Sequence, residues 1–265
     1  MNIAPMIDDA QRHAQAATGR VALITGAARG LGLAIASELG RAGHPVVLLD
    51  STEGVAHSAA RLRAAGADAR ALRLNIADEA AVRELPARLR ALGPHWDRLS
   101  IVVNNAGISP KTNGVKRTIA EMSASEWHEV IAVNLTGTFL VTQTCLPALC
   151  ARGWGRVVMI TSQAARTRTP VPGAHYAASK AGITGFARVL AGEIAAHGVT
   201  VNCVAPGRIA SDMTDAVDPA LNAKLAEIIP VGRLGRAEEV AAAVAVLVSE
   251  GATYQTRANI DNKSG

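Results

Sequence analysis

The segment RVALITGAARGLG, residues 20–32, runs from an apolar stretch into a glycine-rich turn, and the helical pattern LAIASELGRAG follows it. A short apolar run bounded by glycine is typical of a buried parallel strand. Gly26 permits a tight turn, while Gly30 and Gly32 let the backbone and the next helix approach a pyrophosphate, whose charge a helix N-terminus favours. In this setting the loop predicts a dinucleotide-binding unit rather than a loop that merely turns.

Further apolar runs alternate with alanine-rich helical patterns along the chain. They are PVVLLD (45–50), ARALRL (69–74), LSIVVN (99–104), GRVVMIT (155–161) and VTVNCVA (199–205). This alternation predicts a single α/β domain, a three-layer doubly wound parallel sheet over residues 20–265, after a polar extension at residues 1–19. Ligands should collect at the carboxyl ends of the strands. The stretch at 207–235 lacks strand character and follows a strand end, so we expect a substrate lid there.

Composition narrows the functional class. With 265 residues and 49% hydrophobic content the chain can bury one large core. The net charge of +5 is spread along the chain, so nucleic-acid binding is not expected. The longest apolar run, residues 240–248, is half of what a membrane span needs, and the acidic N-terminus does not resemble a signal peptide. We therefore expect a cytoplasmic protein with no membrane partner.

Cysteine usage agrees with that location. Cys145, Cys150 and Cys203 are odd in number, and none has metal-ligand spacing with another cysteine or a histidine. We expect reduced cysteines and no metal site.

The stretch AHYAASKAG, residues 174–182, places one of the two tyrosines four residues before one of the five lysines. In a helix these positions share a face, so the phenol of Tyr176 and the ammonium of Lys180 can approach each other. By itself the pair is also compatible with an exposed contact contributing a few tenths of a kcal/mol. The rest of the chain must decide between these interpretations.

Asp50 ends the second predicted strand, eighteen residues beyond Gly32. A carboxylate at this place can accept hydrogen bonds from an adenosine ribose and repel a 2′-phosphate, which favours NAD over NADP. Arg29 within the glycine loop argues the other way, because a guanidinium can bind a 2′-phosphate. We give more weight to Asp50, since the strand end fixes its position.

Several ordered motifs join these features: NNAG at 104–107, VNLTG at 133–137, TS at 161–162, YAASK at 176–180 and APGRI at 205–209. Together they resemble the short-chain dehydrogenase/reductase family over residues 20–262. The resemblance implies a nicotinamide cofactor and catalysis by Asn134, Ser162, Tyr176 and Lys180. The cofactor-binding positions that it implies are Gly26, Arg29, Gly30, Leu31, Gly32, Asp50, Asn75, Ile76, Asn104, Ala106, Gly107, Tyr176, Lys180, Pro206, Gly207 and Ile209.

The chain departs from the family pattern at three places. Asn75 stands where members usually carry an aspartate that contacts adenine, and its amide oxygen can still accept that bond. The interval from Ser162 to Tyr176 is one residue longer than usual, so we expect a bulged loop at residues 166–173. Arg257 replaces a common glycine near the last strand.

A phenol is a poor base at neutral pH, because its pKa lies near 10 and would have to fall by about 3 units, or about 4 kcal/mol. Lys180 and a positive nicotinamide both favour the phenolate, so we expect Tyr176 to take the hydroxyl proton as hydride leaves for the cofactor. Ser162 would hold the substrate oxygen. By resemblance, Lys180 also grips the nicotinamide ribose and Asn134 anchors a water chain, while residues 104–107 line the cleft and residues 206–207 abut the nicotinamide.

We therefore expect an NAD(P)-dependent oxidoreductase that interconverts a secondary alcohol and a ketone. The alternatives are a 3-oxoacyl-carrier-protein reductase-like activity, a catalytically inactive dinucleotide-binding regulator, and a sugar-nucleotide epimerase or dehydratase. Cationic side chains in loops near the cleft hint at an anionic substrate tail, but solvated arginines of an arginine-rich chain are the simpler interpretation: Lys111, Lys116, Arg117, Arg166, Arg168 and Arg208. The apolar faces of residues 130–149 and 180–195 resemble the family's subunit-pairing helices, which predicts a homotetramer.

Overall fold

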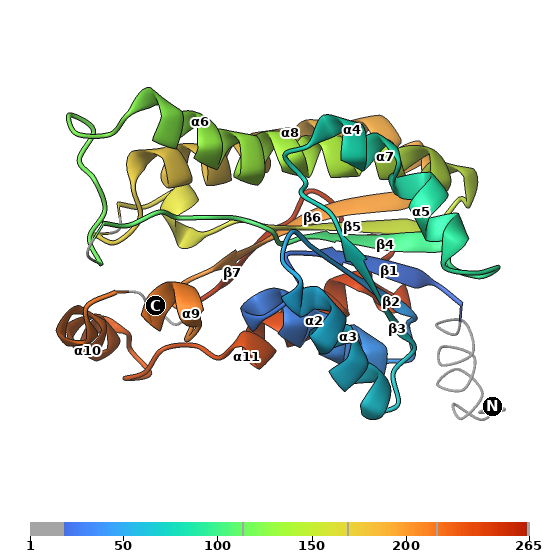
Figure 1. Ribbon diagram of the computed structural model, residues 1–265, viewed down its shortest axis with the longest axis horizontal. Coiled ribbons are helices and arrows are strands. Elements are labelled where there is room, and N and C mark those ends of the chain that lie inside the picture. Colours follow the sequence, from blue (N-terminus) through green and yellow to red (C-terminus); the bar gives the residue numbers. More distant parts are fainter. Residues whose placement is uncertain (1–18, 113, 169, 216, 264–265) are drawn as a thin grey trace, which may run out of the picture.

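The computed structural model describes residues 19–112, 114–168, 170–215 and 217–263, and its centre is a parallel sheet of seven strands (Figure 1). The strand order is β3-β2-β1-β4-β5-β6-β7, so the order reverses between β1 and β4. The strands are β1 (Val21–Thr25), β2 (Val46–Asp50), β3 (Ala69–Arg73), β4 (Leu99–Asn104), β5 (Gly155–Ile160), β6 (Val199–Pro206) and β7 (Asn259–Asn262). The predicted three-layer doubly wound fold is confirmed, and each of the six predicted runs forms a strand.

Helices cover both faces of the sheet (Figure 1). One layer holds α4 (Glu79–Arg83), α5 (Leu85–Ala91), α6 (Ala124–Ile131), the π-helical turn η1 (Ala132–Thr136), α7 (Gly137–Ala151) and α8 (Ala174–Ile194). The other holds α2 (Gly30–Arg41), α3 (Gly54–Ala64) and α11 (Ala237–Val248). Single 3₁₀ turns are η2 (Gln163–Ala165), η3 (Ala195–His197) and η4 (Glu250–Ala252).

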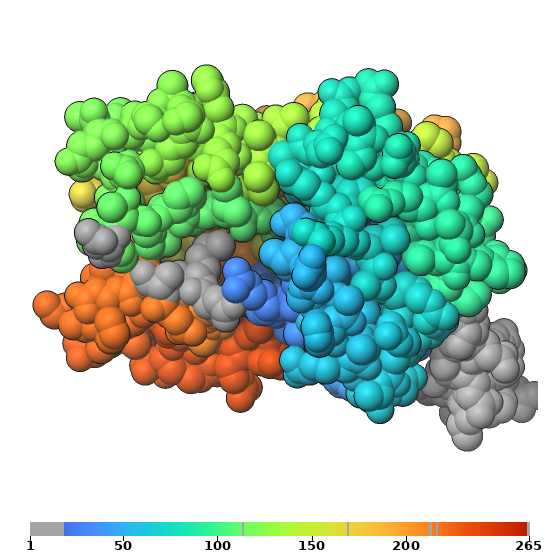
Figure 2. Space-filling view, in the orientation of Figure 1, coloured from blue at the N-terminus to red at the C-terminus, as the bar shows by residue number. Residues whose placement is uncertain are grey.

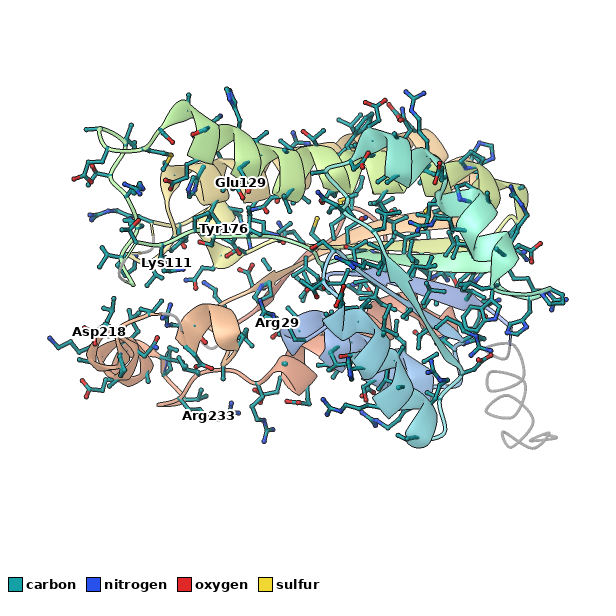
Figure 3. All side chains as sticks on the ribbon, in the orientation of Figure 1. Arg29, Lys111, Glu129, Tyr176, Asp218 and Arg233 are labelled. Carbon is teal, nitrogen blue, oxygen red and sulfur yellow. The ribbon has the colours of Figure 1, made fainter. Side chains whose placement is uncertain are left out.

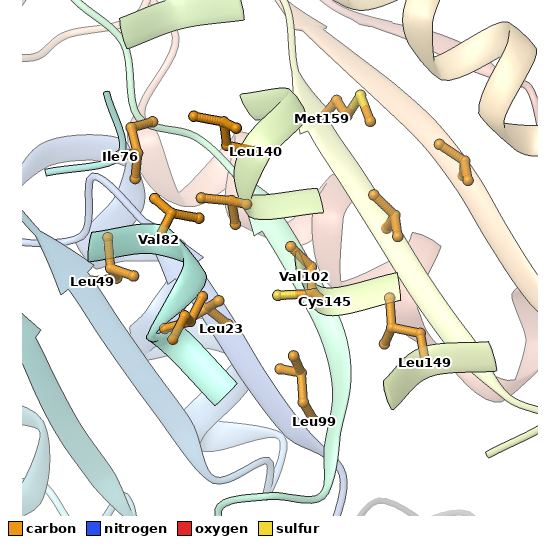
Figure 4. Close-up of a cluster of buried hydrophobic side chains, with 14 of the residues drawn as sticks. Leu23, Leu49, Ile76, Val82, Leu99, Val102, Leu140, Cys145, Leu149 and Met159 are labelled. Atoms are coloured by element: carbon orange, nitrogen blue, oxygen red, sulfur yellow. The ribbon is translucent and has the colours of Figure 1, made fainter. Parts of the chain in front are cut away.

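The continuous apolar runs follow from this double covering. Along β1, Val21 and Leu23 pack into the core beneath α4, α5, α7 and α8, while Ala22 and Ile24 pack into the core beneath α2, α3 and α11. Successive strand residues point to opposite faces, so a strand with two buried faces needs an apolar residue at every position. Figure 4 shows part of the first core, with Leu23, Val82, Val102 and Cys145 among its side chains.

The helices α6, η1 and α7 form one continuous stretch, Ala124–Ala151, that is long and apolar enough to cross a membrane by length and composition. The most apolar 18 residues of this stretch have a mean hydropathy of 1.3, and 39% of them are buried within the molecule. Leu140, Val141 and Leu149 from this stretch belong to the core against β4 and β5. A core helix of a soluble protein meets the same criterion, so the stretch is weak evidence for a membrane span.

The predicted lid region is partly helical. It contains α9 (Asp212–Asp215) and α10 (Pro219–Ile228), which lie apart from the sheet below its carboxyl edge (Figure 1). Its two ends are joined, because Ile209 pairs with Gly235 and the carbonyl of Arg208 accepts a bond from the Gly235 amide at 2.9 Å. The segment between Ile209 and Gly235 is therefore a flap whose two ends are joined by backbone bonds.

Of the remaining expectations, all three cysteines are free thiols: Cys145 and Cys203 are buried, and Cys150 is half-buried. The N-terminal extension lies outside the described residues except for Gly19.

Candidate active site

A cleft of about 1740 Å³ opens at the carboxyl ends of the strands. The glycine loop and the start of α2 line one wall, the segment after β4 lines another, and the flap closes the end. Figure 2 shows the α6 layer and the flap as two lobes that face each other. In Figure 3, Tyr176 and Lys111 lie on the upper side and Arg29 lies at the start of α2.

Two glycines of the loop are required by packing within the protein. A Cβ on Gly26 would lie 2.7 Å from the Ala106 Cα, and a Cβ on Gly32 would collide with the Gly26 carbonyl oxygen. Gly32 therefore lets α2 approach the end of β1, a packing role that was not predicted, while its place beside a bound pyrophosphate stays a prediction. Gly30, with a φ of +53°, faces open space beside the α2 N-terminus, so the loop fits a dinucleotide phosphate there.

The amide that secures this loop is Asn105. Its Nδ2 donates to the carbonyl oxygens of Thr25 and Gly26 at 3.0 and 3.1 Å. The Thr25 hydroxyl in turn accepts bonds from the backbone amides of Asn105 and Ala106, both at 3.0 Å. The side chain of Asn105 thus joins the β1 and β4 ends across the point where the strand order reverses.

Asn104 corrects the prediction for the NNAG motif. Its side chain is buried and donates to the Thr142 hydroxyl on α7 at 2.9 Å, so it does not line the cleft. Asn104 is the last residue of β4, and alternation along the strand turns its side chain toward the helix layer. The motif reaches the cleft through residues 105–107 instead.

Asp50 lies at the end of β2, as predicted, and borders the cleft. Its Oδ2 accepts a bond from the Ala28 amide at 3.1 Å, and its Oδ1 accepts bonds from the amide and the hydroxyl of Thr52, both at 2.9 Å. These donors fix the position of the side chain. Asp50 therefore also braces the glycine loop, a role that spacing alone did not indicate.

The other predicted adenine-side residues, Leu31, Asn75 and Ile76, line the same part of the cleft. Asn75 is exposed, and its Oδ1 accepts a bond from the Ala77 amide at 3.0 Å. Ile76 is buried and occupies the space that a Cβ on Gly137 would need. Arg29 is exposed at the cleft mouth, immediately before α2.

Ser162, Tyr176 and Lys180 come together on the floor of the cleft. Ser162 follows β5, and Tyr176 and Lys180 lie in the first two turns of α8. The Ser162 hydroxyl lies near enough to the Tyr176 phenol for a hydrogen-bonding interaction that lowers the phenol pKa. The Lys180 Nζ donates to the Ile160 carbonyl oxygen at 2.8 Å and lies 5.6 Å from the centre of the Tyr176 ring.

The charges differ from the sequence-based expectation. Burial raises the pKa of Tyr176 above its ordinary value, and the hydrogen bond with Ser162 partly opposes that change. Burial also lowers the pKa of Lys180 to about 8, opposed by its interaction with Cys203. We expected Lys180 to lower the phenol pKa, but its ammonium is directed to the Ile160 carbonyl and burial dominates. Burial therefore keeps Tyr176 a protonated phenol at neutral pH.

Asn134 lies in the π-helical turn η1 and is completely buried. Its Oδ1 accepts a bond from the Ile108 amide at 2.8 Å, and its Nδ2 donates to the Ile108 carbonyl at 3.0 Å and to the Ser179 hydroxyl at 3.1 Å. It therefore holds the segment after β4 against α8. Gly107 lies between, since a Cβ there would be 3.4 Å from both Asn134 Oδ1 and Lys180 Nζ.

A buried histidine next to the tyrosine escaped the sequence analysis. The Nδ1 of His175 accepts a bond from the Tyr176 amide at 2.7 Å, so its other nitrogen, Nε2, donates to Glu126 on α6 at 3.1 Å. Arg117 pairs with the other oxygen of Glu126 at 2.8 Å. The only sequence signal was a histidine directly before the tyrosine, which does not by itself indicate a partner fifty residues away.

The segment after β6 completes the wall. Pro206, Gly207 and Ile209 border the cleft, as predicted. A Cβ on Gly207 would lie 2.8 Å from the Lys263 Cβ and 3.5 Å from the Gln163 Oε1, so only glycine fits between the C-terminal segment and the residue after Ser162. Among the described residues no group of three or more histidine, cysteine or carboxylate side chains could hold a metal ion.

Comparison with known proteins gives consistent similarities. The family model described as short chain dehydrogenase matches residues 20–222. The chain is 38% identical over 248 residues to a 3-oxoacyl-[acyl-carrier-protein] reductase of Pseudomonas aeruginosa, covering 93% of this chain and 97% of that protein. It is 40% identical over 240 residues to the same-named protein of Aquifex aeolicus, covering 90% and 93%.

A solved structure gives the same similarity in three dimensions. A 3-oxoacyl-[acyl-carrier protein] reductase from Brucella melitensis with bound NAD superposes with a TM-score of 0.86 at 35% identity, covering 98% of this chain and 96% of that one.

Proposed function

This chain belongs to the short-chain dehydrogenase family and is an NAD(P)-dependent oxidoreductase that interconverts an alcohol and a ketone; we propose that Ser162, Tyr176 and Lys180 carry out its proton transfer. The observation that carries the proposal is that Ser162, Tyr176 and Lys180 border one cleft together with the glycine loop, with the Ser162 hydroxyl near enough to the Tyr176 phenol to lower its pKa. Lys180 borders the same cleft, and Asn134 lies buried behind it, bonded to Ile108 and to Ser179 of α8.

When bound, the nicotinamide supplies the hydride acceptor or donor. In the direction of reduction, Ser162 donates a hydrogen bond to the ketone oxygen and Tyr176 gives it the proton that balances the incoming hydride. The raised pKa of Tyr176 favours this role, because the phenol is protonated at neutral pH. Oxidation needs the phenolate instead, so its rate should rise with pH.

Asn134 and Lys180 act on the surroundings of the phenol. The Asn134 amide fixes the Ile108 backbone, and Gly107 leaves room beside the Lys180 ammonium. We assign Lys180 to binding the cofactor ribose and to stabilising the phenolate when it forms. The Asn134 side chain is occupied by protein partners, which supports a positioning role more than direct contact with a water chain.

Replacing Tyr176 tests the proposal. Tyr176→Phe should lower kcat by at least about 100-fold, because acid–base groups contribute 10²- to 10⁴-fold, while NADH affinity measured by fluorescence should change little. The matched control is Tyr254→Phe, which alters the fully exposed second tyrosine. Retention of more than about a tenth of kcat by Tyr176→Phe would reject the assignment. Absence of turnover in the unmodified protein with both cofactors would favour an inactive dinucleotide-binding regulator.

We also propose a preference for NAD over NADP, which the fixed carboxylate of Asp50 supports. A second candidate activity is reduction of a 3-oxoacyl-carrier-protein, favoured by the names of several relatives. For the whole molecule we propose a cytoplasmic homotetramer. The free thiols are compatible with a reducing compartment.

A further inference from the structure

Two cationic side chains border the cleft, and neither forms an ion pair with a carboxylate among the described residues. Lys111 comes from the segment after β4 and Arg208 from the segment after β6, and both are half-buried. Each segment begins close to the catalytic residues. Gly107, four residues before Lys111, lies against the Lys180 Nζ, and Gly207, next to Arg208, lies against Gln163.

Arg208 is held by a neutral partner. The Asn222 Oδ1 on α10 accepts bonds from its Nε, at 3.0 Å, and from one of its Nη atoms. Asn222 is itself fixed, because its Nδ2 donates to the Thr214 carbonyl at 2.8 Å. A guanidinium has five N–H donors, and the others on Arg208 have no partner among the described residues. The flap therefore orients this cation without neutralising it.

Lys111 also forms no ion pair among the described residues. Its Nζ donates to the Ser109 carbonyl at 3.3 Å, and its pKa is lowered first by burial and then by the positive charge of Arg208. Burial lowers the pKa of Arg208 as well. Two like charges that repel each other in a partly desolvated cleft are stabilised by an anion placed between them.

The carboxylates that border the cleft do not fill this role. Asp50 lies at the adenosine end and is bonded to Ala28 and Thr52. Glu239 is paired with Arg233 at 2.7 Å. Glu129 on α6 is exposed and forms no ion pair with either cation among the described residues. Arg168 also borders the cleft but is exposed, so its charge is solvated.

We propose that Lys111 and Arg208 together bind a carboxylate of the substrate, so that the enzyme acts on a hydroxy acid and its oxo acid. This inference rests on the proposed oxidoreductase function and names its substrate class. A guanidinium and an ammonium that border the same cleft and act on each other electrostatically can bind the two oxygens of one carboxylate, with the alcohol or ketone carbon placed toward Ser162 and Tyr176. A 3-oxoacyl thioester carries no charge next to its carbonyl groups and would leave the pair unneutralised.

A panel of ketones tests this substrate class. Pyruvate, acetoacetate, 4-oxopentanoate and 5-oxohexanoate place the carboxylate at increasing distance from the ketone, and each is compared with its methyl ester. The N-acetylcysteamine thioester of acetoacetate represents the acyl-carrier alternative. With NADH and with NADPH, at least one acid should exceed its ester by tenfold or more in kcat/KM. Faster reduction of the ester at every chain length, or of the thioester over every acid, would overturn the inference.

Substitutions at Lys111 and Arg208 test whether these two residues cause the preference for the acid over its ester. Arg208→Gln and Lys111→Gln should each lower the acid-to-ester ratio at least fivefold, whereas Lys111→Arg keeps the charge and should retain most of it. The matched control is Lys224→Gln, an exposed lysine on α10 that does not border the cleft. A ratio that Arg208→Gln and Lys111→Gln leave unchanged would assign the acid preference to other residues and overturn the proposal.

A binding measurement separates failure of the inference from failure of the proposed function. Calorimetry on the NADH-loaded protein compares pentanoate with pentanamide, which differ in charge and cannot be reduced. Binding of pentanoate that Arg208→Gln abolishes supports the site even if no ketone is turned over, which would contradict only the proposed function. Ketone reduction without any preference for acids, together with equal binding of pentanoate and pentanamide, would overturn the inference and leave the proposed function intact.

Discussion

Arg257 has a backbone φ of +62°, the one positive value at a non-glycine position among the described residues. Its amide donates to the Val201 carbonyl at 2.8 Å, so the turn before β7 requires this conformation. The left-handed region costs a side-chain-bearing residue about 1–2 kcal/mol, which explains why glycine is common here in the family. The replacement that the sequence showed as a departure is therefore a point of strain.

We expect Arg257→Gly to stabilise the protein. Relief of the strain exceeds the extra chain entropy of glycine, about 0.5–1 kcal/mol, so the net gain should be about 0.5–1 kcal/mol, or roughly 1–4 °C in Tm. Thermal unfolding at fixed protein concentration measures it. Arg257→Ala is the control, since alanine removes the charge but keeps the strain. Equal Tm values for the glycine and alanine variants would show that the left-handed backbone at Arg257 does not destabilise the protein.

Lys180 is a residue whose replacement should raise stability and abolish activity. Its pKa of about 8 in the folded protein lies below its ordinary value of 10.5, so burial of the charge costs about 3 kcal/mol at neutral pH. Lys180→Met removes that cost. It also leaves the Ile160 carbonyl without its donor, which destabilises the folded protein by about 1 kcal/mol. We expect the variant to be inactive and about 2 kcal/mol more stable at pH 7.

The sign of the pH dependence follows from the lowered pKa. Below pH 8 both states carry the proton and the full cost is present, and between pH 8 and 10.5 the folded state releases it first, so the cost disappears. The advantage of Lys180→Met in urea unfolding should therefore shrink as the pH approaches 10. Lys224→Met, at an exposed lysine, should show no advantage at either pH. A methionine variant less stable than the original protein at pH 7 would contradict this account.

At the scale of elements, the sequence predicted the sheet more completely than the contacts around it. Strands buried on both faces give continuous apolar runs, so β1, β2 and β4 were recognisable within a residue or two of their ends. Side-chain direction at a strand end is not encoded in such a run, which is why Asn104 was assigned to the cleft in place of Asn105. The link from α6 to α8 through Glu126 and His175 joins distant segments, and no local pattern indicates it.

The end of β2 and the glycine loop together should set the choice of cofactor. The side chain of Asp50 is held in place by Ala28 and Thr52, and a 2′-phosphate would bring like charges together in a partly desolvated cleft. We expect kcat/KM to favour NAD over NADP by at least tenfold, or about 1.4 kcal/mol. Steady-state kinetics with both cofactors measures the ratio.

Asp50→Ser with Ser51→Arg should reverse this preference, because it removes the repulsion and adds a phosphate partner. Since Asp50 also braces Ala28, the single variant Asp50→Ser is the control that separates loosening of the loop from phosphate binding. If the unmodified enzyme prefers NADP, the charge of Arg29 at the cleft mouth outweighs that of Asp50.

At the scale of the whole molecule, the layer of α7 and α8 leaves apolar side chains in solvent. Phe139 on α7 is 40% exposed and Val189 on α8 is 58% exposed. The Phe139 ring packs edge-on against Phe186 of α8, with 6.0 Å between centroids, so the exposed ring of α7 also contacts α8. Exposed apolar surface of this kind marks an interaction site more often than free solvent contact.

We therefore expect four copies to assemble, with this surface as one of the interfaces. Light scattering at micromolar concentration should give a mass of about 109 kDa, four times that of the 27.3 kDa chain. Phe139→Asp places a charge in the interface and should reduce the mass to that of a dimer or a single chain. Ile228→Asp, at a position 76% exposed on the flap, is the matched control and should leave the mass unchanged. A single-chain mass for the unmodified protein would reject the tetramer, and Arg257→Gly would then show whether the strained turn before β7 prevents assembly.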